Sequence, residues 1–440
     1  MKRTILFATE YWGSHAPGGA EWTNAAWAGA LARRGHRVVV VTPNYGGASR
    51  EDHDGVVIVR PSFPLALFRH AAGEQREAPW LLHRNLPFRA WFSRHIRRMA
   101  RAEGADLIHA QNKGAVVAGW RAARALGVPF AVTIRDVGLL CPLGAPLSED
   151  WTAFDCSTRD YFDRCVPFFL DNYATDAGAL RRARQWLSLR AAWLDQGVRR
   201  RALADADLVL GVSRGILSIF PPRLVNAARA RVIYSPRPVV SGALEDPASV
   251  RRRFGVGAGP LVLYAGKRSL GKGTDVLVRA MDTIRASVPG VTFVLAGKGE
   301  IAPPARGDVH VLGSMPQPTL FALYRAADVV VVPSIWPEPL SRVLIEAMDF
   351  GRAVVATRVG GSPELVENDV TGLLIAPRDP DALARAVVAL LRDPARRARL
   401  GAAAASFTAR ELDEEKLVTE LLDAYESVLA QRAEPQPRPA

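Results

Sequence analysis

The sequence predicts an α/β protein made of two doubly wound units, each a parallel sheet with helices on both faces. Three observations predict this class. The chain has 440 residues, more than a single hydrophobic core usually serves. Short apolar, β-branched runs alternate with longer helical patterns, which is typical of parallel sheets. This alternation stops at a Ser-Pro-Arg-Pro break, residues 235–238, and then starts again.

The first half of the chain contains a series of predicted strands separated by helices. Its basic start leads into an apolar run that Glu10 interrupts early, so we expect a first strand and not a signal peptide. A helix over residues 20–34 ends before Gly35, a common stop signal. The predicted strands cover residues 4–9, 38–42, 56–60, 107–110, 130–133, 208–212 and 231–234.

The second half repeats the pattern after a linker near residues 235–250. Predicted strands cover residues 261–265, 292–296, 310–312, 329–332 and 353–357. We therefore expect one domain over residues 1–240 and a second over residues 241–416. The Pro-rich residues 431–440 are predicted to be disordered.

Composition narrows the class of protein further. Hydrophobic residues at 49% and charged residues at 23% are ordinary for a globular protein. No run of about 18 apolar residues occurs, so no membrane-spanning helix is predicted. The three cysteines, Cys141, Cys156 and Cys165, are too few for a disulfide framework and lack a fourth ligand at zinc spacing. We expect buried thiols and no metal site.

The net charge of +13 comes from 51 arginines and only six lysines against 44 acidic residues. Such an arginine bias can reflect genome composition alone, and no nucleic-acid module is present, so no nucleic-acid partner is predicted. Residues 63–101 combine eight arginines with many aromatic and leucine side chains. Either this stretch rests on an anionic membrane, or it forms amphipathic helices that cover the sheet. The aromatic and leucine residues that define the segment 63–101 are Phe63, Phe68, Trp80, Leu81, Leu82, Phe88, Trp91 and Phe92.

A second arginine-rich segment, residues 181–201, is predicted to be a solvated helix face.

Residues 333–348 place two carboxylates, Glu338 and Glu346, across a predicted loop-to-helix junction. A strand precedes this loop and another follows the helix, so the loop lies where open α/β sheets bind ligands. We expect Pro339 in the first helical turn, which leaves the backbone N–H groups of Leu340, Ser341 and Arg342 able to bind a phosphate. Glu346, about two turns further on, would accept from a sugar hydroxyl.

The segment from Glu338 to Glu346 resembles the E-x7-E motif of retaining glycosyltransferases of the GT-B fold, glycosyltransferase family four in particular. The resemblance continues to Gly361, Glu364 and Gly372, and weaker similarity covers residues 1–415. It implies two Rossmann-like domains, Glu338 at the donor sugar, Glu346 at the ribose, and a last helix over residues 417–430 that returns to the first domain. Ser341 stands where the family commonly has glycine.

A glycine-rich loop with two lysines follows the first strand of the second domain. Gly266 permits positive φ, and Lys267 and Lys272 bring positive charge to the sheet edge. The loop is similar to the family's Gly-Arg…Lys-Gly loop, which holds the donor diphosphate, with Lys267 in place of the arginine. Two alternatives remain for this loop. It could be a P-loop, although the motif does not match at Gly273, where a P-loop has Ser or Thr, or it could be an ordinary glycine turn.

A second glycine loop carries Gly297 and Lys298 and is similar to the family's short loop beside the nucleotide. Three of the six lysines, Lys267, Lys272 and Lys298, fall in these two loops. In a chain that otherwise uses arginine, this concentration suggests local selection, although six lysines are few enough for chance.

Two segments of the first domain also resemble the family. Gly18 and Gly19 are similar to its Gly-Gly loop near the sugar and acceptor. Arg135 and Asp136, followed by Cys141, are similar to its His-Asp…Cys-Pro segment, with Arg135 in place of the histidine. We expect Asp136 to orient a substrate and Arg135 to contact the sugar.

Together these residues predict transfer of a sugar from a UDP- or GDP-sugar to a glycan or lipid-linked acceptor hydroxyl, with anomeric retention and without a metal or cofactor. Lys267, Lys272, Glu338 and Asp136 are the expected catalytic residues. The protein is expected in the cytoplasm, peripheral on the inner membrane face. A nucleotide-sugar epimerase and a catalytically silent donor-binding protein are the alternatives.

Overall fold

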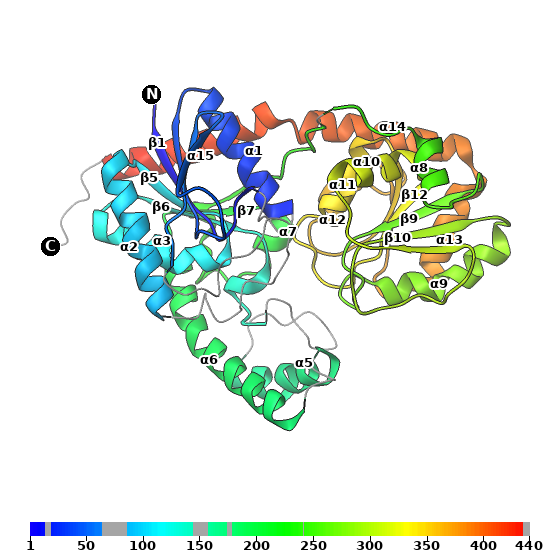
Figure 1. Cartoon of the computed structure of the whole chain (residues 1–440), viewed down its shortest axis with the longest axis horizontal. Coiled ribbons are helices and arrows are strands. Elements are labelled where there is room, and N and C mark those ends of the chain that lie inside the picture. The colour runs from blue at the N-terminus through cyan, green and yellow to red at the C-terminus, as the bar shows by residue number, and fades with distance from the viewer. Residues whose placement is uncertain (14–18, 64–85, 144–156, 174–177, 241, 434–440) are drawn as a thin grey trace. The chain divides into compact units, whose positions relative to one another are not determined.

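The computed structural model describes residues 1–13, 19–63, 86–143, 157–173, 178–240 and 242–433 (Figure 1). The chain divides into two compact units. Unit 1 comprises Met1–Tyr234 together with Glu414–Ala440, and unit 2 comprises Ser235–Asp413. Unit 1 is therefore discontinuous in sequence, whereas unit 2 is continuous.

Unit 1 is built on an eight-stranded sheet with the order β3-β4-β2-β1-β5-β6-β7-β8. All neighbours pair in parallel except β3 and β4, which are antiparallel. The central strands are buried along nearly their whole length, as the four consecutive valines of β2 predict for a sheet covered on both faces. The strands are β1 (Thr4–Ala8), β2 (Arg37–Val41), β3 (Arg50–His53), β4 (Val56–Val59), β5 (Leu107–Ala110), β6 (Phe130–Ile134), β7 (Leu208–Gly211) and β8 (Ala230–Val232).

Helices cover both faces of the sheet in unit 1. Helix α1 (Gly19–Arg33) and the last helix, α15 (Glu414–Ala433), bury Trp27, Leu31, Leu421 and other apolar side chains against one face. Helices α2 (Leu86–Glu103) and α3 (Lys113–Leu126) pack against each other on the other face, where α2 contacts β1 and β2 and α3 contacts β5 and β6. Because α15 continues to Ala433, the predicted disordered tail starts too early; the rest of that tail lies outside the described residues.

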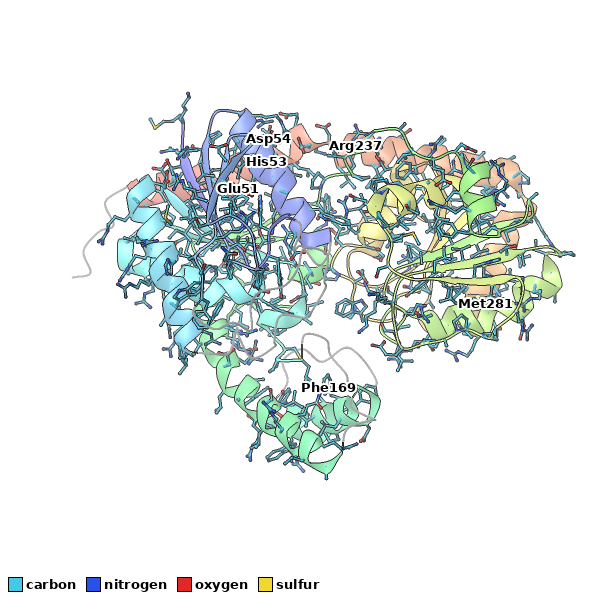
Figure 2. All side chains as sticks on the ribbon, viewed as in Figure 1. Glu51, His53, Asp54, Phe169, Arg237 and Met281 are labelled. Atoms are coloured by element: carbon cyan, nitrogen blue, oxygen red, sulfur yellow. The ribbon has the colours of Figure 1, made fainter. Side chains whose placement is uncertain are left out.

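A helical segment between β6 and β7 extends unit 1. It packs around Tyr161, Cys165 and Leu189, and Phe169 of α5 borders this small core (Figure 2). Its longest member is α6 (Ala179–Ala204), 26 residues. The shorter elements of unit 1 are the 3₁₀ turns η3 (Val137–Leu139) and η5 (Ala227–Arg229), α4 (Thr158–Asp160), the π turn η4 (Tyr161–Cys165), α5 (Val166–Tyr173) and α7 (Arg214–Leu217).

Unit 2 contains a six-stranded, fully parallel sheet with the order β11-β10-β9-β12-β13-β14. The chain winds outward from β9 in one direction and from β12 in the other. The sheet therefore has its topological switch point between β9 and β12. Its strands are β9 (Leu261–Ala265), β10 (Thr292–Ala296), β11 (Val309–Leu312), β12 (Val329–Val332), β13 (Ala353–Thr357) and β14 (Leu373–Ile375).

The core of unit 2 lies between this sheet and two helices. Helices α9 (Thr274–Ser287) and α13 (Pro380–Arg392) contribute Met281 and Leu383, each almost inaccessible to solvent (Figure 2). The other helices of unit 2 are α8 (Pro247–Arg253), α10 (Gln317–Ala326), α11 (Arg342–Asp349), α12 (Ser362–Leu365) and α14 (Pro394–Glu411). Among the described residues, no helix combines the length and apolarity needed to cross a membrane.

Candidate active site

The loops after β9 and β12 come together at the switch point of unit 2. Ligands of open α/β sheets bind beyond the carboxyl ends of the strands at such a point. The β9 loop carries Lys272 and the β12 loop carries Glu338. The sequence predicts both residues in a donor site, and the fold places them after the two strands that flank the switch point.

Lys272 and Glu338 form a direct ion pair. The Lys272 Nζ lies 2.7 Å from Glu338 Oε1 and 2.6 Å from Oε2. Glu338 Oε2 also accepts from the Trp336 indole N–H at 2.8 Å and from the Ser334 hydroxyl at 3.2 Å. Within the described residues, Oε1 accepts from Lys272 alone. One ammonium N–H and one carboxylate lone pair therefore remain without a partner in the described part of the chain.

Glu338 is buried but ionised. Its exposed fraction is 7%, and burial by itself would raise the pKa of the carboxyl. The Lys272 ammonium and the hydrogen bonds from Trp336 and Ser334 outweigh burial and hold the pKa of Glu338 below its usual value. Behind the carboxylate, the Glu338 carbonyl accepts from the backbone N–H of Gly361 at 2.8 Å. Lys272 and Glu338 are thus both charged, and hydrogen bonds hold the Glu338 side chain in place.

The helix that follows Glu338 starts later than the sequence predicts. Helix α11 begins at Arg342, and the Ser341 hydroxyl caps it by accepting from the Leu344 N–H at 3.3 Å. Pro339 and Leu340 therefore belong to the loop, and the prediction that Pro339 occupies the first helical turn is wrong. Of the three N–H groups predicted to bind a phosphate, only that of Arg342 lies within the helix.

Glu346 lies one turn into α11 and is 3% exposed. Its Oε1 accepts from Arg342 Nε at 3.2 Å, and its Oε2 accepts from the Tyr324 hydroxyl at 3.1 Å. Burial raises the pKa of Glu346 above its usual value, although Arg342 and the Tyr324 hydroxyl act in the opposite direction. Glu338 and Glu346 share no partner in the described chain, so the two glutamates occupy separate environments.

Close backbone contacts fix the two glycine loops against each other. A Cβ on Gly297 would lie 2.1 Å from the Gly266 carbonyl oxygen, and Gly297 has a φ of +136°. The Gly266 N–H donates to the Ala296 carbonyl at 2.9 Å. Tyr264 adds a tether, because its hydroxyl donates to the Lys267 carbonyl at 2.7 Å. Both predicted loops therefore meet at one sheet edge.

The other two predicted lysines lie apart from the ion pair. Lys267 Nζ contacts Glu300 Oε1 at 3.0 Å, and both side chains are more than half exposed. Lys298 is exposed and forms no ion pair with a described acidic residue. Of the three predicted lysines, only Lys272 is held by a buried carboxylate.

In unit 1, Arg135 is held by several groups. Its guanidinium donates to Asn24 Oδ1 at 2.6 Å and to Gln111 Oε1 at 3.3 Å, and it lies 5.1 Å from the centre of the Trp27 ring. These contacts fix the orientation of Arg135, which stands where the similar family segment has a histidine.

Asp136 belongs to a charged cluster that the sequence did not predict. Its Oδ2 lies 3.2 Å from Lys113 Nζ, and its Oδ1 accepts from the Gly138 N–H at 2.6 Å. Glu10 is buried, and burial raises its pKa to about 7 against the opposing charge of Lys113. These residues follow the neighbouring strands β6, β5 and β1. Lys113 is one of only six lysines in the chain. The rarity of lysine was the signal in the sequence that could have indicated this cluster.

The remaining predicted residues are two glycines and three cysteines of unit 1. Gly18 and Cys156 lie outside the described residues, and Gly19 is the first residue of α1. Cys165 is buried and Cys141 is half-buried. The described part of the chain contains no group of three His, Cys, Asp or Glu side chains arranged to hold a metal.

The basic, aromatic stretch over residues 63–101 is only partly described, because Phe68, Trp80, Leu81 and Leu82 lie outside the described residues. Phe88 and Phe92 of α2 are 2% and 1% exposed. They pack against each other, and Phe88 also packs on Trp91 and Phe63. For Phe88 and Phe92 the structure favours the second alternative, an amphipathic helix that covers the sheet, because both side chains are buried within unit 1.

Two sequence families match this chain. Residues 17–237 match the family described as Glycosyltransferase Family 4, and residues 259–393 match the family described as Glycosyl transferases group 1. The first match includes Lys113, Arg135 and Asp136. The second includes Lys272, Glu338 and Glu346.

Several curated proteins are similar in sequence. An uncharacterized glycosyltransferase of Methanocaldococcus jannaschii is 35% identical over 34% of this chain and 40% of its own length. A glycogen synthase of Mycobacterium tuberculosis is 30% identical over 62% of this chain and 66% of its own. The chain thus spans less than two thirds of either relative. A GDP-mannose-dependent alpha-(1-6)-phosphatidylinositol monomannoside mannosyltransferase of Mycolicibacterium smegmatis is 31% identical over 55% of this chain and 69% of its own.

Solved structures share the fold over nearly the whole chain. Sucrose-phosphate synthase from Thermosynechococcus elongatus has a TM-score of 0.70 at 21% identity, and the match covers 98% of this chain and 100% of its own. The Anabaena protein HepE in complex with UDP-glucose has a TM-score of 0.67 at 20% identity, and the match covers 97% and 100%. The predicted GT-B class, with two Rossmann-like units, is confirmed.

Proposed function

This chain belongs to glycosyltransferase family 4, and on that premise we propose that it transfers a sugar from a nucleoside diphosphate donor to an acceptor hydroxyl with retention at the anomeric carbon. The observation that carries the proposal is the Lys272–Glu338 pair at the switch point between β9 and β12. It combines a cation for a leaving diphosphate with a carboxylate for a sugar hydroxyl.

The departing diphosphate is the group whose negative charge grows during transfer. Lys272 has one N–H beyond the two that Glu338 accepts, and Lys267 lies in the same loop. A cation held in place, as Lys272 is, stabilises a leaving group electrostatically, and this is usually the largest contribution to catalysis. The Arg342 and Val343 N–H groups at the start of α11 add a partial positive charge.

The proposed step breaks the bond between the anomeric carbon and the diphosphate oxygen. A bond from the acceptor oxygen to the same carbon forms on the same face, and the acceptor proton passes to the departing phosphate oxygen. Glu338 would orient the donor sugar through its open Oε1 position. Glu346 would bind the ribose, and Arg135 and Asp136 would orient the sugar or acceptor. No protein nucleophile or metal is invoked.

The names of the relatives support the proposed substrate classes. One relative is named as GDP-mannose-dependent, and one structural neighbour was solved with UDP-glucose, which supports a GDP- or UDP-sugar donor. The names of the relatives include a glycogen synthase and a phosphatidylinositol monomannoside mannosyltransferase, which supports a glycan or lipid-linked acceptor.

Thermal unfolding with UDP, GDP, ADP and ATP, with and without magnesium, tests the donor site. A ligand at about 100 times its Kd stabilises a protein by about 2.7 kcal/mol. We expect a magnesium-independent shift with UDP or GDP that Glu346→Gln abolishes and that Glu367→Gln, at an exposed glutamate of unit 2, retains. A shift confined to ATP with magnesium would instead support the P-loop alternative.

Product analysis separates the remaining alternatives. With the nucleotide identified, the corresponding nucleotide sugar is incubated with and without candidate acceptors. Acceptor-dependent release of the nucleoside diphosphate and a product with the donor's anomeric configuration are expected. Isomerised donor without acceptor would indicate an epimerase, and binding without turnover would indicate a donor-binding protein.

A further inference from the structure

Helix α6 exposes a row of leucines on one side. Leu180, Leu187 and Leu194 are 86%, 62% and 79% exposed. Residues seven apart lie on nearly the same side of a helix, with a drift of about 20° per step. The three leucines therefore form one apolar row, about 21 Å long at about 1.5 Å per residue.

Basic side chains lie beside the row. Helix α6 contains seven arginines and one acidic residue, Asp195, although Arg182 pairs with Asp171 and Arg199 is buried. Asp195 is turned inward, where it pairs with Arg89 and Arg199. Arg184 and Arg201 form no ion pair with any acidic residue in the described ranges. The exposed side of α6 is therefore both apolar and basic.

A groove continues this surface between α3 and α6. It has a volume of about 680 Å³, and its lining includes Trp120, Leu194 and Val198 together with Arg121, Arg124 and Arg201. Trp120 is only 8% exposed, and Arg124 is held by Asp205 at 3.4 Å. Apolar walls beside arginines suit a molecule with an apolar chain and an anionic head.

We infer that α6 and the α3–α6 groove form a docking surface for an anionic phospholipid membrane. An amphipathic helix that lies in the membrane interface needs apolar side chains on one side and basic residues beside them, and α6 has both. A second copy of this chain fits poorly, because two α6 surfaces would bring arginines together without acidic partners. Nucleic acid fits poorly as well, because it offers the leucine row no apolar contact.

Vesicle co-sedimentation tests this surface directly. Vesicles of phosphatidylcholine alone are compared with vesicles containing about 30% phosphatidylglycerol, at about 0.1 M and about 0.5 M salt. We expect binding only to the anionic vesicles and weaker binding at the higher salt. Equal binding to both vesicles, or none to either, would overturn the inference.

Substitutions in α6 test whether the membrane-binding surface lies on this helix. Leu187→Ser and Leu194→Ser should each weaken binding by about tenfold, and Arg184→Gln by about fivefold. Because these side chains are exposed, the circular dichroism and the nucleotide-induced thermal shift should not change. Leu86→Ser, at a 63% exposed leucine that starts α2, is the matched control and should bind normally.

Each alternative has its own result. Loss of binding in Leu86→Ser but not in the α6 variants would place the membrane contact on α2 and contradict the inference. Light scattering that shows a dimer in wild type and a monomer in Leu187→Ser, without vesicle binding, would assign α6 to self-association. None of these measurements depends on catalysis, so the proposed transfer reaction can fail while the membrane inference stands.

Discussion

Lys272 neutralises a carboxylate that would otherwise be buried alone. Glu338 is 7% exposed, and its side chain accepts from Lys272, Trp336 and Ser334. Removing one partner of a buried pair is costly because the remaining charge is left unpaired. The pair therefore affects both stability and the proposed chemistry, and the two effects can be separated.

Lys272→Met should destabilise unit 2 by about 1–3 kcal/mol, less than for a fully buried pair because the lysine side chain is 31% exposed. Lys272→Met with Glu338→Gln should recover most of that loss. Turnover should fall by about two to three orders of magnitude in both. Denaturant unfolding and steady-state kinetics measure the two effects.

Lys267→Met is the control for the stability measurement, because it also removes a lysine charge. The Lys267–Glu300 pair is exposed and should contribute less than about 1 kcal/mol to the free energy of unfolding. If Lys272→Met were as stable as wild type, or the double variant no more stable than the single, the buried-pair argument would fail.

Glu10 should make unit 1 less stable as the pH rises. Burial raises the pKa of Glu10 from its ordinary 4.5 to about 7. The folded state then binds the Glu10 proton more tightly than the unfolded state, so the contribution of Glu10 to stability is most favourable below pH 4.5 and declines until about pH 7. The full change is about 3 kcal/mol. Glu10→Gln should remove this fall, which unfolding of both proteins at about pH 5 to 8 would measure; parallel pH profiles would contradict it.

Helix α15 is connected to Arg135 by a chain of buried hydrogen bonds. The Tyr425 hydroxyl lies 2.6 Å from His109 Nδ1, Gln111 Nε2 lies 3.0 Å from the same atom, and His109 Nε2 lies 2.7 Å from Thr133 Oγ1. Arg135 can only donate, so Gln111 presents its carbonyl to Arg135 and its amide N–H to His109. Nδ1 of His109 must then accept, and the ring proton sits on Nε2.

Nitrogen NMR of histidine-labelled protein should therefore find His109 neutral, with the proton on Nε2, well below about pH 6. Burial and the charge of Arg135 lower the pKa of His109 to about 3. Tyr425→Phe should keep this tautomer and cost about 1 kcal/mol. A proton on Nδ1, or titration near the ordinary histidine pKa of 6.5, would contradict the proposed connection.

Much of the element order follows from the sequence, because buried parallel strands are continuous β-branched runs. The predicted strands at residues 261–265, 292–296, 329–332 and 353–357 coincide with β9, β10, β12 and β13. Two strands were missed for physical reasons. Strand β3 has the sequence Arg-Glu-Asp-His and is an exposed antiparallel edge, and β14 is a Leu-Leu-Ile segment with a single β-branched residue.

The candidate site was predictable in part. Lys272 and Glu338 are marked by a lysine in an arginine-rich chain and by the glutamate spacing, and the structure joins them. The predicted start of α11 is too early because proline also suits a first turn; Ser341, a common N-cap residue, was the competing signal in the sequence. Glu10 was missed because sequence cannot show that a carboxyl after a strand is buried.

At the scale of the whole molecule, the last helix completes the first unit. Leu421 is fully buried in the core that β1 and β2 share with α15, and Glu426 pairs with Arg3 at 2.6 Å. Unit 2 lies between these segments in the sequence and has its own core. Damage to α15 should therefore affect unit 1 selectively.

Leu421→Ala should destabilise unit 1 by about 2–5 kcal/mol through the cavity it leaves. Hydrogen exchange should then quicken in β1 and β2 while β9 and β12 keep their protection. Leu383→Ala, at an equally buried leucine of unit 2, is the matched variant and should give the opposite pattern. Uniformly faster exchange in both variants would show that the units unfold together.

The return of α15 to unit 1 also sets an order for folding during synthesis. Unit 2 is continuous and can form its core as soon as residue 413 has left the ribosome. The sheet of unit 1, made first, keeps the part of one apolar face beside α1 uncovered until Leu417, Leu421 and Tyr425 emerge. Exposed apolar surface of this kind favours aggregation, so the nascent chain should depend most on chaperones during the interval before its last helix is made.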